Sequence, residues 1–103
     1  MPRWKLDKHD AKFSKNPIWQ RKDDAKTTAP QGKLDAFQNA IHHHGTHPMD
    51  AAAEAGDLDY KSLGIHGPDG ELHQIRLNQH ERATFWVNPE NHTVKLHQIG
   101  GHT

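Results

Sequence analysis

The sequence contains no cysteine and no long hydrophobic run. A chain without cysteine forms no disulfide bonds and offers no thiolate to a metal ion, and it suits a reducing compartment. No apolar stretch approaches the roughly 18 residues of a membrane-spanning helix, and the N-terminus lacks the apolar region of a signal peptide. We therefore expect a cytoplasmic protein with no membrane segment.

Hydrophobic residues are also scarce, at 32% of the 103 residues. Globular domains typically have about 45–50% apolar residues, although that set includes glycine. A chain of this length is expected to form one domain with a small core, and such domains are only marginally stable. The composition therefore leaves room for stabilisation by a partner or by self-association without requiring either.

The formal net charge is zero, but the charges are unevenly distributed. Residues 1–35 hold nine Lys and Arg against five Asp, whereas residues 36–103 hold four Lys and Arg against eight Asp and Glu. The eleven His residues gain positive charge as the pH falls toward about 6.5. The asymmetry predicts a basic N-terminal arm and linker over residues 1–32, ahead of a domain over residues 33–103. The alternative for the arm is a solvated leader of mixed charge.

Aromatic residues are set among the charges of this arm, and Trp4 and Leu6 alternate as a short strand would. Basic residues mixed with aromatic ones can follow a nucleic-acid backbone. Aromatic side chains of an arm more often pack on their own domain, and we favour that interpretation.

Helical spacing becomes clear after residue 33. Leu34, Phe37, Ala40 and Ile41 recur at intervals of three and four residues, and Gly45 is a typical C-terminal stop. A first helix is therefore predicted to end near Gly45.

A second, shorter helix is predicted to follow directly. Thr46 or His47 can cap it, Pro48 fits its first turn, and Gly56 ends it. Residues 57–63 are a possible strand, and residues 64–70, with a Pro-Asp-Gly turn signal, are predicted to form a loop.

Three alternating segments follow, at residues 71–77, 82–87 and 94–97, and Asn88-Pro89-Glu90-Asn91 is a typical turn between the last two. One face of the resulting meander is apolar: Ile75, Leu77, Ala83, Phe85, Val87, Val94 and Leu96. The other face is polar: Gln74, Arg76, Arg82, Thr84, Trp86, Lys95 and His97. We predict an α+β fold in which two N-terminal helices pack on the apolar face of a small antiparallel sheet.

The motifs of this region occur in a recognisable order. They are Tyr60-Lys61-x-Leu63, then Gly70-Glu71-Leu72-His73-Gln74-Ile75-Arg76-Leu77, then Arg82-Ala83-Thr84-Phe85-Trp86-Val87, and finally His97-Gln98-Ile99-Gly100-Gly101-His102. This order resembles the RelE/HigB/ParE superfamily of bacterial toxins. The resemblance covers about two thirds of the chain, from Lys33 to His102.

The resemblance implies a small endoribonuclease of a toxin–antitoxin pair that cleaves mRNA on the ribosome without a metal or other cofactor. In that reaction the ribose 2′-hydroxyl attacks the adjacent phosphate. The step needs a base for the hydroxyl proton, an acid for the leaving oxygen, and cations for the charge that builds on the phosphorus centre. The expected partners are mRNA, the ribosome and an antitoxin protein.

Arg76 and Arg82 share one face of adjacent predicted strands, and we predict that they hold the phosphate in the transition state. The resemblance makes His102 the leading acid or base, with His97 next. Lys61 and Lys95 are predicted substrate-binding cations.

Each of these residues also has a purely structural interpretation. Arg76 could pair with Glu71 or Glu81 on a neighbouring strand, which contributes little energy. His97 could be a cross-strand packing residue, and His102 could lie in a frayed terminus. Trp86 could stack on a base or simply cover the sheet.

The run His42-His43-His44-Gly45-Thr46-His47 invites a metal-site interpretation, because imidazoles bind zinc, nickel and copper. Consecutive helical residues point about 100° apart, so adjacent His side chains cannot all face one ion. We favour a solvated helix terminus and predict no metal site.

Two other classes of function remain open from the sequence. A ParE-like protein poisons DNA gyrase by binding and needs no acid or base. A degenerate toxin fold could serve as a protein- or RNA-binding module, which the small core would suit.

Overall fold

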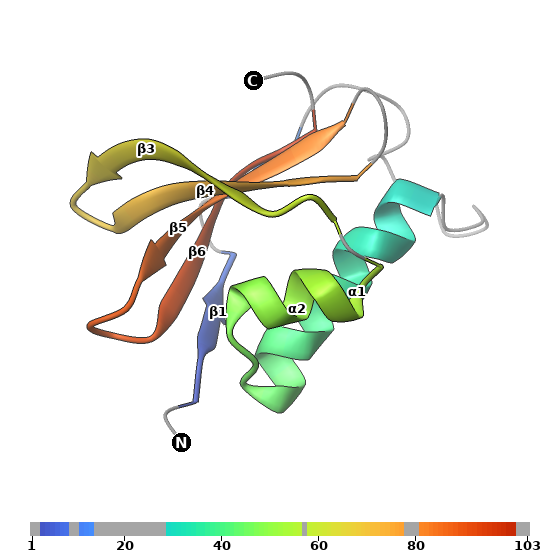
Figure 1. Cartoon of the computed structure of the whole chain (residues 1–103), viewed down its shortest axis with the longest axis horizontal. Coiled ribbons are helices and arrows are strands. Elements are labelled where there is room, and N and C mark those ends of the chain that lie inside the picture. The colour runs from blue at the N-terminus through green and yellow to red at the C-terminus, as the bar shows by residue number, and fades with distance from the viewer. Residues whose placement is uncertain (1–2, 9–10, 14–28, 57, 78–80, 101–103) are drawn as a thin grey trace.

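The computed structural model describes residues 3–8, 11–13, 29–56, 58–77 and 81–100. A mixed sheet packs on a pair of helices, and both helices lie on one side of it (Figure 1). The elements in chain order are β1 (Lys5–Asp7), β2 (Lys12–Phe13), α1 (Ala29–His44), α2 (Pro48–Glu54), β3 (Lys61–Gly67), β4 (Gly70–Arg76), β5 (Arg82–Asn88) and β6 (Thr93–Ile99). The α+β class is confirmed.

The sheet has the strand order β1-β6-β5-β4-β3, and β2 also pairs with β6. The strands from β4 to β6 form the predicted antiparallel meander, and β3 adds a fourth antiparallel strand beside β4. By contrast, β1 and β2 run parallel to β6. A purely antiparallel sheet was therefore the wrong expectation. The helices are also not the first elements, because β1 and β2 precede α1. Strand β1 lies at one edge of the sheet, next to β6, and β3 lies at the opposite edge. Helices α1 and α2 connect these two edges along the chain.

The start of the predicted arm belongs to the domain. Trp4 is only 8% exposed and Leu6 packs against the core, while Lys5 is exposed. Leu6 is the cross-strand partner of Val94. Alternation of apolar and polar residues therefore makes these residues an edge strand, and Trp4 packs on its own domain as favoured above. Residues 14–28 lie outside the described residues.

Helix α1 begins at Ala29, inside the segment predicted as a linker. Proline at the second position, Pro30, costs no helical hydrogen bond because the first-turn N–H groups have no partner within the helix. The predicted apolar stripe is buried, with Phe37 and Ile41 fully inaccessible. The helix ends at His44, and Gly45 follows with a φ of 65°, the left-handed conformation typical of a glycine stop.

Strand β3 differs from the expectation. It spans Lys61–Gly67, so it begins later than predicted and occupies most of the predicted loop. Gly67 and Gly70 are cross-strand partners, so Pro68 and Asp69 alone form the turn. The register shifts between Ser62 and Ile65, a bulge that left the strand without clear alternation in the sequence.

The core lies between α1 and one face of the meander, called here the inner face. The Phe37 ring of α1 lies 5.1 Å from the Phe85 ring of β5, and both side chains are fully buried. The predicted apolar residues of β4, β5 and β6 all face this core. No helix among the described residues is long and apolar enough to cross a membrane.

Candidate functional site

The opposite face of the meander, called here the outer face, carries the predicted polar residues. No helix within the described ranges covers it (Figure 1). Cross-strand partners lie on the same face of a sheet, so the register groups the outer side chains into rows. The rows are Arg76 and Arg82; then Lys61, Gln74, Thr84 and Gln98; then Ile65, Leu72, Trp86 and Lys95.

Arg76 and Arg82 are direct partners across β4 and β5. The Arg76 side chain is 49% exposed, and its Nη2 lies 3.8 Å from Oδ2 of Asp59. Glu71 is on the inner face, because its cross-strand partner is Val87, so it cannot be the partner of Arg76 considered above. The structure thus places two arginines opposite each other at one end of the outer face.

Lys61 lies one row from the arginines, opposite Gln74. Lys95 and Trp86 belong to the row farthest from the arginines. Trp86 follows Arg82 by four residues, which is about 13 Å along the strand. Nζ of Lys95 is 3.4 Å from Oδ2 of Asp69 in the β3–β4 turn. One end of the outer face therefore carries the two arginines, and the other end carries an indole ring and one partnered lysine.

Trp86 and His97 are neighbours on the outer face. Their ring centroids are 5.8 Å apart. The Trp86 ring also packs over Gly67, where an added Cβ would lie 3.2 Å from it. His97 is exposed and sits at the register shift of β6, between the partners of Thr84 and Phe85. The structural interpretations of both residues therefore agree with these contacts: Trp86 covers part of the sheet, and His97 packs against a residue of the neighbouring strand.

His102 lies outside the described residues. The last described residue, Gly100, donates its N–H to the backbone oxygen of Arg82 at 2.6 Å. The chain therefore passes the Arg82 backbone two residues before His102.

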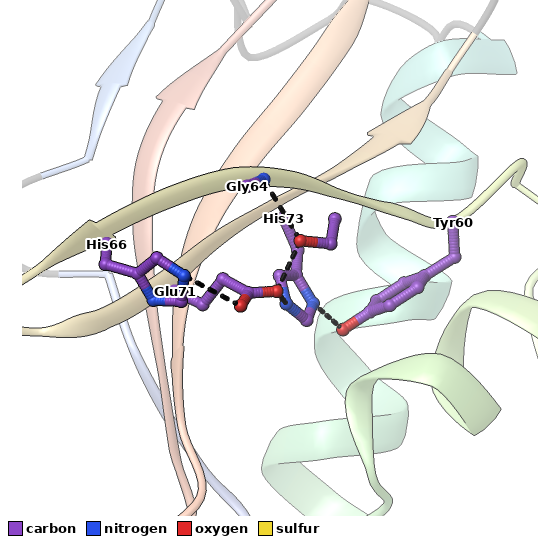
Figure 2. A network of polar contacts seen from close by, with 6 residues as sticks. Tyr60, Gly64, His66, Glu71 and His73 are labelled. Carbon is purple, nitrogen blue, oxygen red and sulfur yellow. Dashed lines mark hydrogen bonds and ion pairs between the residues drawn. The ribbon is translucent and has the colours of Figure 1, made fainter.

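A second polar cluster, absent from the sequence-based prediction, lies on the inner face of the β3–β4 hairpin (Figure 2). His73 joins two partners through its two ring nitrogens. Nε2 is 2.8 Å from Oε1 of Glu71, and Nδ1 meets the hydroxyl of Tyr60. Because a carboxylate only accepts hydrogen bonds, Nε2 carries a proton, and in the neutral ring Nδ1 accepts from Tyr60.

The Glu71 carboxylate collects further contacts from β3. Ser62 donates its hydroxyl to Oε1, and Nε2 of His66 lies 3.5 Å from Oε2. Ser62 Oγ in turn accepts the N–H of Gly64 at 3.1 Å, inside the bulge. The cluster therefore ties the irregular part of edge strand β3 to its neighbour β4.

These contacts shift two ionisation equilibria. The bonds from Ser62 and His73 lower the pKa of Glu71. Burial, with a smaller contribution from the Glu71 charge, raises the pKa of Tyr60 well above its usual range. The cluster thus holds a carboxylate and a protonated phenol joined by one imidazole.

A sequence signal for this cluster did exist. Glu71 and His73 are separated by one residue, so in a strand they share a face. The prediction placed polar function on the outer face alone, because the inner face was expected to be dry. Figure 1 shows part of the reason why it is not, because the tip of the β3–β4 hairpin lies away from the two helices. Tyr60 and His73 lie closer to the core, in ring contact with Phe85.

Comparison with known proteins identifies the fold. No protein-family model and no curated protein matches the chain. Among solved structures, it is similar to a chain in the crystal structure of the archaeal RelE–RelB complex from Pyrococcus horikoshii OT3. The TM-score is 0.55 at 14% identity, over 98% of this chain and 96% of that chain. The fold is RelE-like. At this identity the similarity establishes the fold and not the activity.

The histidine run lies at the end of α1 in this RelE-like fold, and its solvated interpretation fits. His42, His43 and His44 are exposed, and the first two rings are 4.8 Å apart. His47 instead caps α2, accepting the N–H of Met49 on Nδ1 at 3.1 Å. Within the described ranges no group of His, Cys, Asp and Glu is arranged to hold a metal ion.

Proposed function

We propose that this chain is the toxin of a toxin–antitoxin pair and acts as a metal-free endoribonuclease on mRNA, with the ribosome as its setting. The RelE-like fold supports the general assignment. The observation that carries the nuclease proposal is the direct pairing of Arg76 with Arg82 on the outer face.

Two arginines in this position suit a phosphodiester that gains negative charge during cleavage. Each guanidinium is permanently charged and presents a planar set of donors to phosphate oxygens. Arg76 is half-exposed, so a polynucleotide lying on the sheet can reach it. Lys61, one row away, extends the positive charge along the path of a backbone.

The proton transfers are assigned to histidines near β6. His102 comes two residues after Gly100, whose N–H donates a hydrogen bond to the backbone oxygen of Arg82. In the proposed role one imidazole removes the 2′-hydroxyl proton as that oxygen bonds to phosphorus, and a protonated group donates a proton to the 5′-oxygen as its bond to phosphorus breaks. His97 is the second candidate, and its contact with Trp86 places it beside the aromatic surface on which a base would stack.

An antitoxin is the expected protein partner. The similar solved structure is a complex of RelE with RelB. For this chain we propose that an antitoxin covers the outer face and neutralises the arginines with acidic side chains. The outer face carries the exposed Ile65, at 50%, in the same row as Trp86, which gives such a partner an apolar contact at the end of the face opposite the arginines.

The test is induced expression in a bacterium, with growth and the positions of mRNA 5′ ends as readouts. Wild type, Arg82→Ala and His102→Ala are compared with Lys5→Ala, which removes an exposed charge from β1. Growth arrest with new mRNA ends that both site variants abolish, and the control retains, supports the proposal. Arrest with broken DNA and no new RNA ends would instead indicate a gyrase poison, and the absence of arrest would indicate a binding module.

A further inference from the structure

A surface cavity of about 620 Å³ lies where three chain segments distant in sequence meet. The segments are the residues just before β1, the stretch from the end of α1 to the first turn of α2, and the turn between β5 and β6. The side chains that matter here are Arg3, Trp4, His44, His47, Asp50 and His92. None of them belongs to the outer face, so the inference is independent of the proposed function.

Arg3 is fixed at the wall of this cavity. Its stem lies against Gly45, where an added Cβ would be 2.3 Å from Cγ of Arg3. Its Nη2 donates to the backbone oxygens of His43, at 2.7 Å, and His42, at 3.4 Å. Both bonds use one nitrogen. A guanidinium has five N–H donors, so Nη1 and Nε retain donors for a ligand.

The backbone holds the three segments together. Trp4 donates its N–H to the oxygen of Gly45 at 3.1 Å, and Lys5 donates to the oxygen of His92 at 2.8 Å. His92 has a φ of 52°, a conformation that non-glycine residues adopt infrequently and that is often found at binding sites.

Two imidazoles flank the buried Trp4 ring. The His47 ring lies 4.8 Å from it at an interplanar angle of 73°, and the His92 ring lies 5.2 Å from it at 76°. Nδ1 of His47 accepts the Met49 N–H, so the neutral ring carries its proton on Nε2. His47 therefore keeps a hydrogen-bond donor on Nε2.

The charges around the cavity favour an anion. Among its lining residues, one permanent cation and three imidazoles face a single carboxylate, Asp50. The donors come from three segments that are distant in the sequence. We propose that this cavity binds a phosphate group, carried by inorganic phosphate or by a mononucleotide.

The experiment follows the His imidazole and Trp indole signals of the full chain by NMR while inorganic phosphate is added at constant ionic strength. We expect saturable shifts at His47, His92 and Trp4, three rings that line the cavity. Equal shifts on adding chloride, or no saturation with either phosphate or a nucleoside monophosphate, would refute the proposal.

Variants can be chosen to spare the fold. His92→Asn retains a side chain that tolerates positive φ, and His47→Ser retains a capping oxygen. Each should weaken phosphate binding at pH 6 several-fold, and Asp50→Asn should strengthen it, whereas His42→Asn, outside the cavity, should change nothing. Binding unaltered by His92→Asn and His47→Ser in a folded protein would overturn the assignment. A nucleoside monophosphate that binds more tightly than phosphate identifies a nucleotide as the ligand, whereas equal affinity identifies the phosphate group alone.

Discussion

Arg76 and Arg82 face each other across β4 and β5, on the side of the sheet away from the helices. Like charges directly opposite each other in a sheet reduce stability, by an amount comparable to the roughly 0.2–1 kcal/mol of other cross-strand pairs. Arg76 also forms an ion pair with Asp59, and the proposed phosphate contact would give the arginine pair a further role.

Replacing Arg76 with Gln should separate activity from stability. We expect the free energy of unfolding in urea to stay within about 1 kcal/mol of wild type or to rise, because a like-charge contact is relieved. The proposed RNA cleavage should fall about 10²- to 10³-fold, the usual loss on removing a group that stabilises transition-state charge. Lys5→Gln is the control. Strong destabilisation of the variant would show that Arg76 serves the fold. Full activity of the variant would refute its role in cleavage.

Tyr60 is the only tyrosine in the chain, so tyrosinate absorbance reports on this residue alone. Burial and the Glu71 charge raise its pKa above the ordinary 10.0. The folded protein should therefore show little tyrosinate at pH 10, whereas the protein unfolded in urea should be about half ionised there. Glu71→Gln should lower the folded-state pKa. Half-ionisation of folded wild type at pH 10 would mean that Tyr60 is solvated.

Glu71 should make stability depend on pH in the acid range. Its folded-state pKa is lowered from the ordinary 4.5, so the unfolded chain takes up the proton more readily. The stability from this group is fully present above about pH 4.5 and is lost as the pH falls through the lower, folded-state pKa. The difference in unfolding free energy between wild type and Glu71→Gln should accordingly shrink on acidification. The exposed Glu90 provides a charge-matched control, Glu90→Gln, and an identical trend there would rule out the network as the cause.

Two glycines allow backbone strain and steric overlap to be measured separately. Gly70 and Gly56 have similar φ values, 118° and 114°. A Cβ at Gly70 would lie 2.1 Å from the backbone oxygen of Val87, whereas one at Gly56 would meet nothing within 4 Å. Gly56→Ala should cost about 1–3 kcal/mol of unfolding free energy from strain alone. Gly70→Ala should cost clearly more, and equal losses in urea unfolding would contradict the overlap.

The basic arm was the least accurate part of the sequence-based description. Net charge over residues 1–35 is visible in the sequence, but pairing of Leu6 with Val94 depends on a contact between the two ends of the chain. No local periodicity reports such a pairing over only three residues. Deleting the arm would therefore remove an edge strand as well as positive charge, so replacing Lys8 and Lys12 is the better test of whether the arm binds RNA.

Local chemistry was enough to predict the helices and the meander. The stripe from Leu34 to Ile41, the Gly45 stop and the alternation from Ile75 to Leu96 all appear in the structure, because each depends on neighbours within one helical turn or one strand. The same alternation correctly placed Arg76 and Arg82 on one face. Their roles in catalysis, like that of His102, stay predictions.

The Tyr60–His73–Glu71 cluster and the cavity at Trp4 could not be predicted in this way. Both bring together side chains from separate segments: β3 and β4 in the first case, and the residues just before β1, the stretch from the end of α1 to the first turn of α2 and the β5–β6 turn in the second. The sequence alone determines which side chains share a face of one helix or strand, because side-chain direction repeats about every 3.6 residues in a helix and every two in a strand. Which elements meet, and where the helices leave the inner face uncovered, follows from how the whole chain buries its small core.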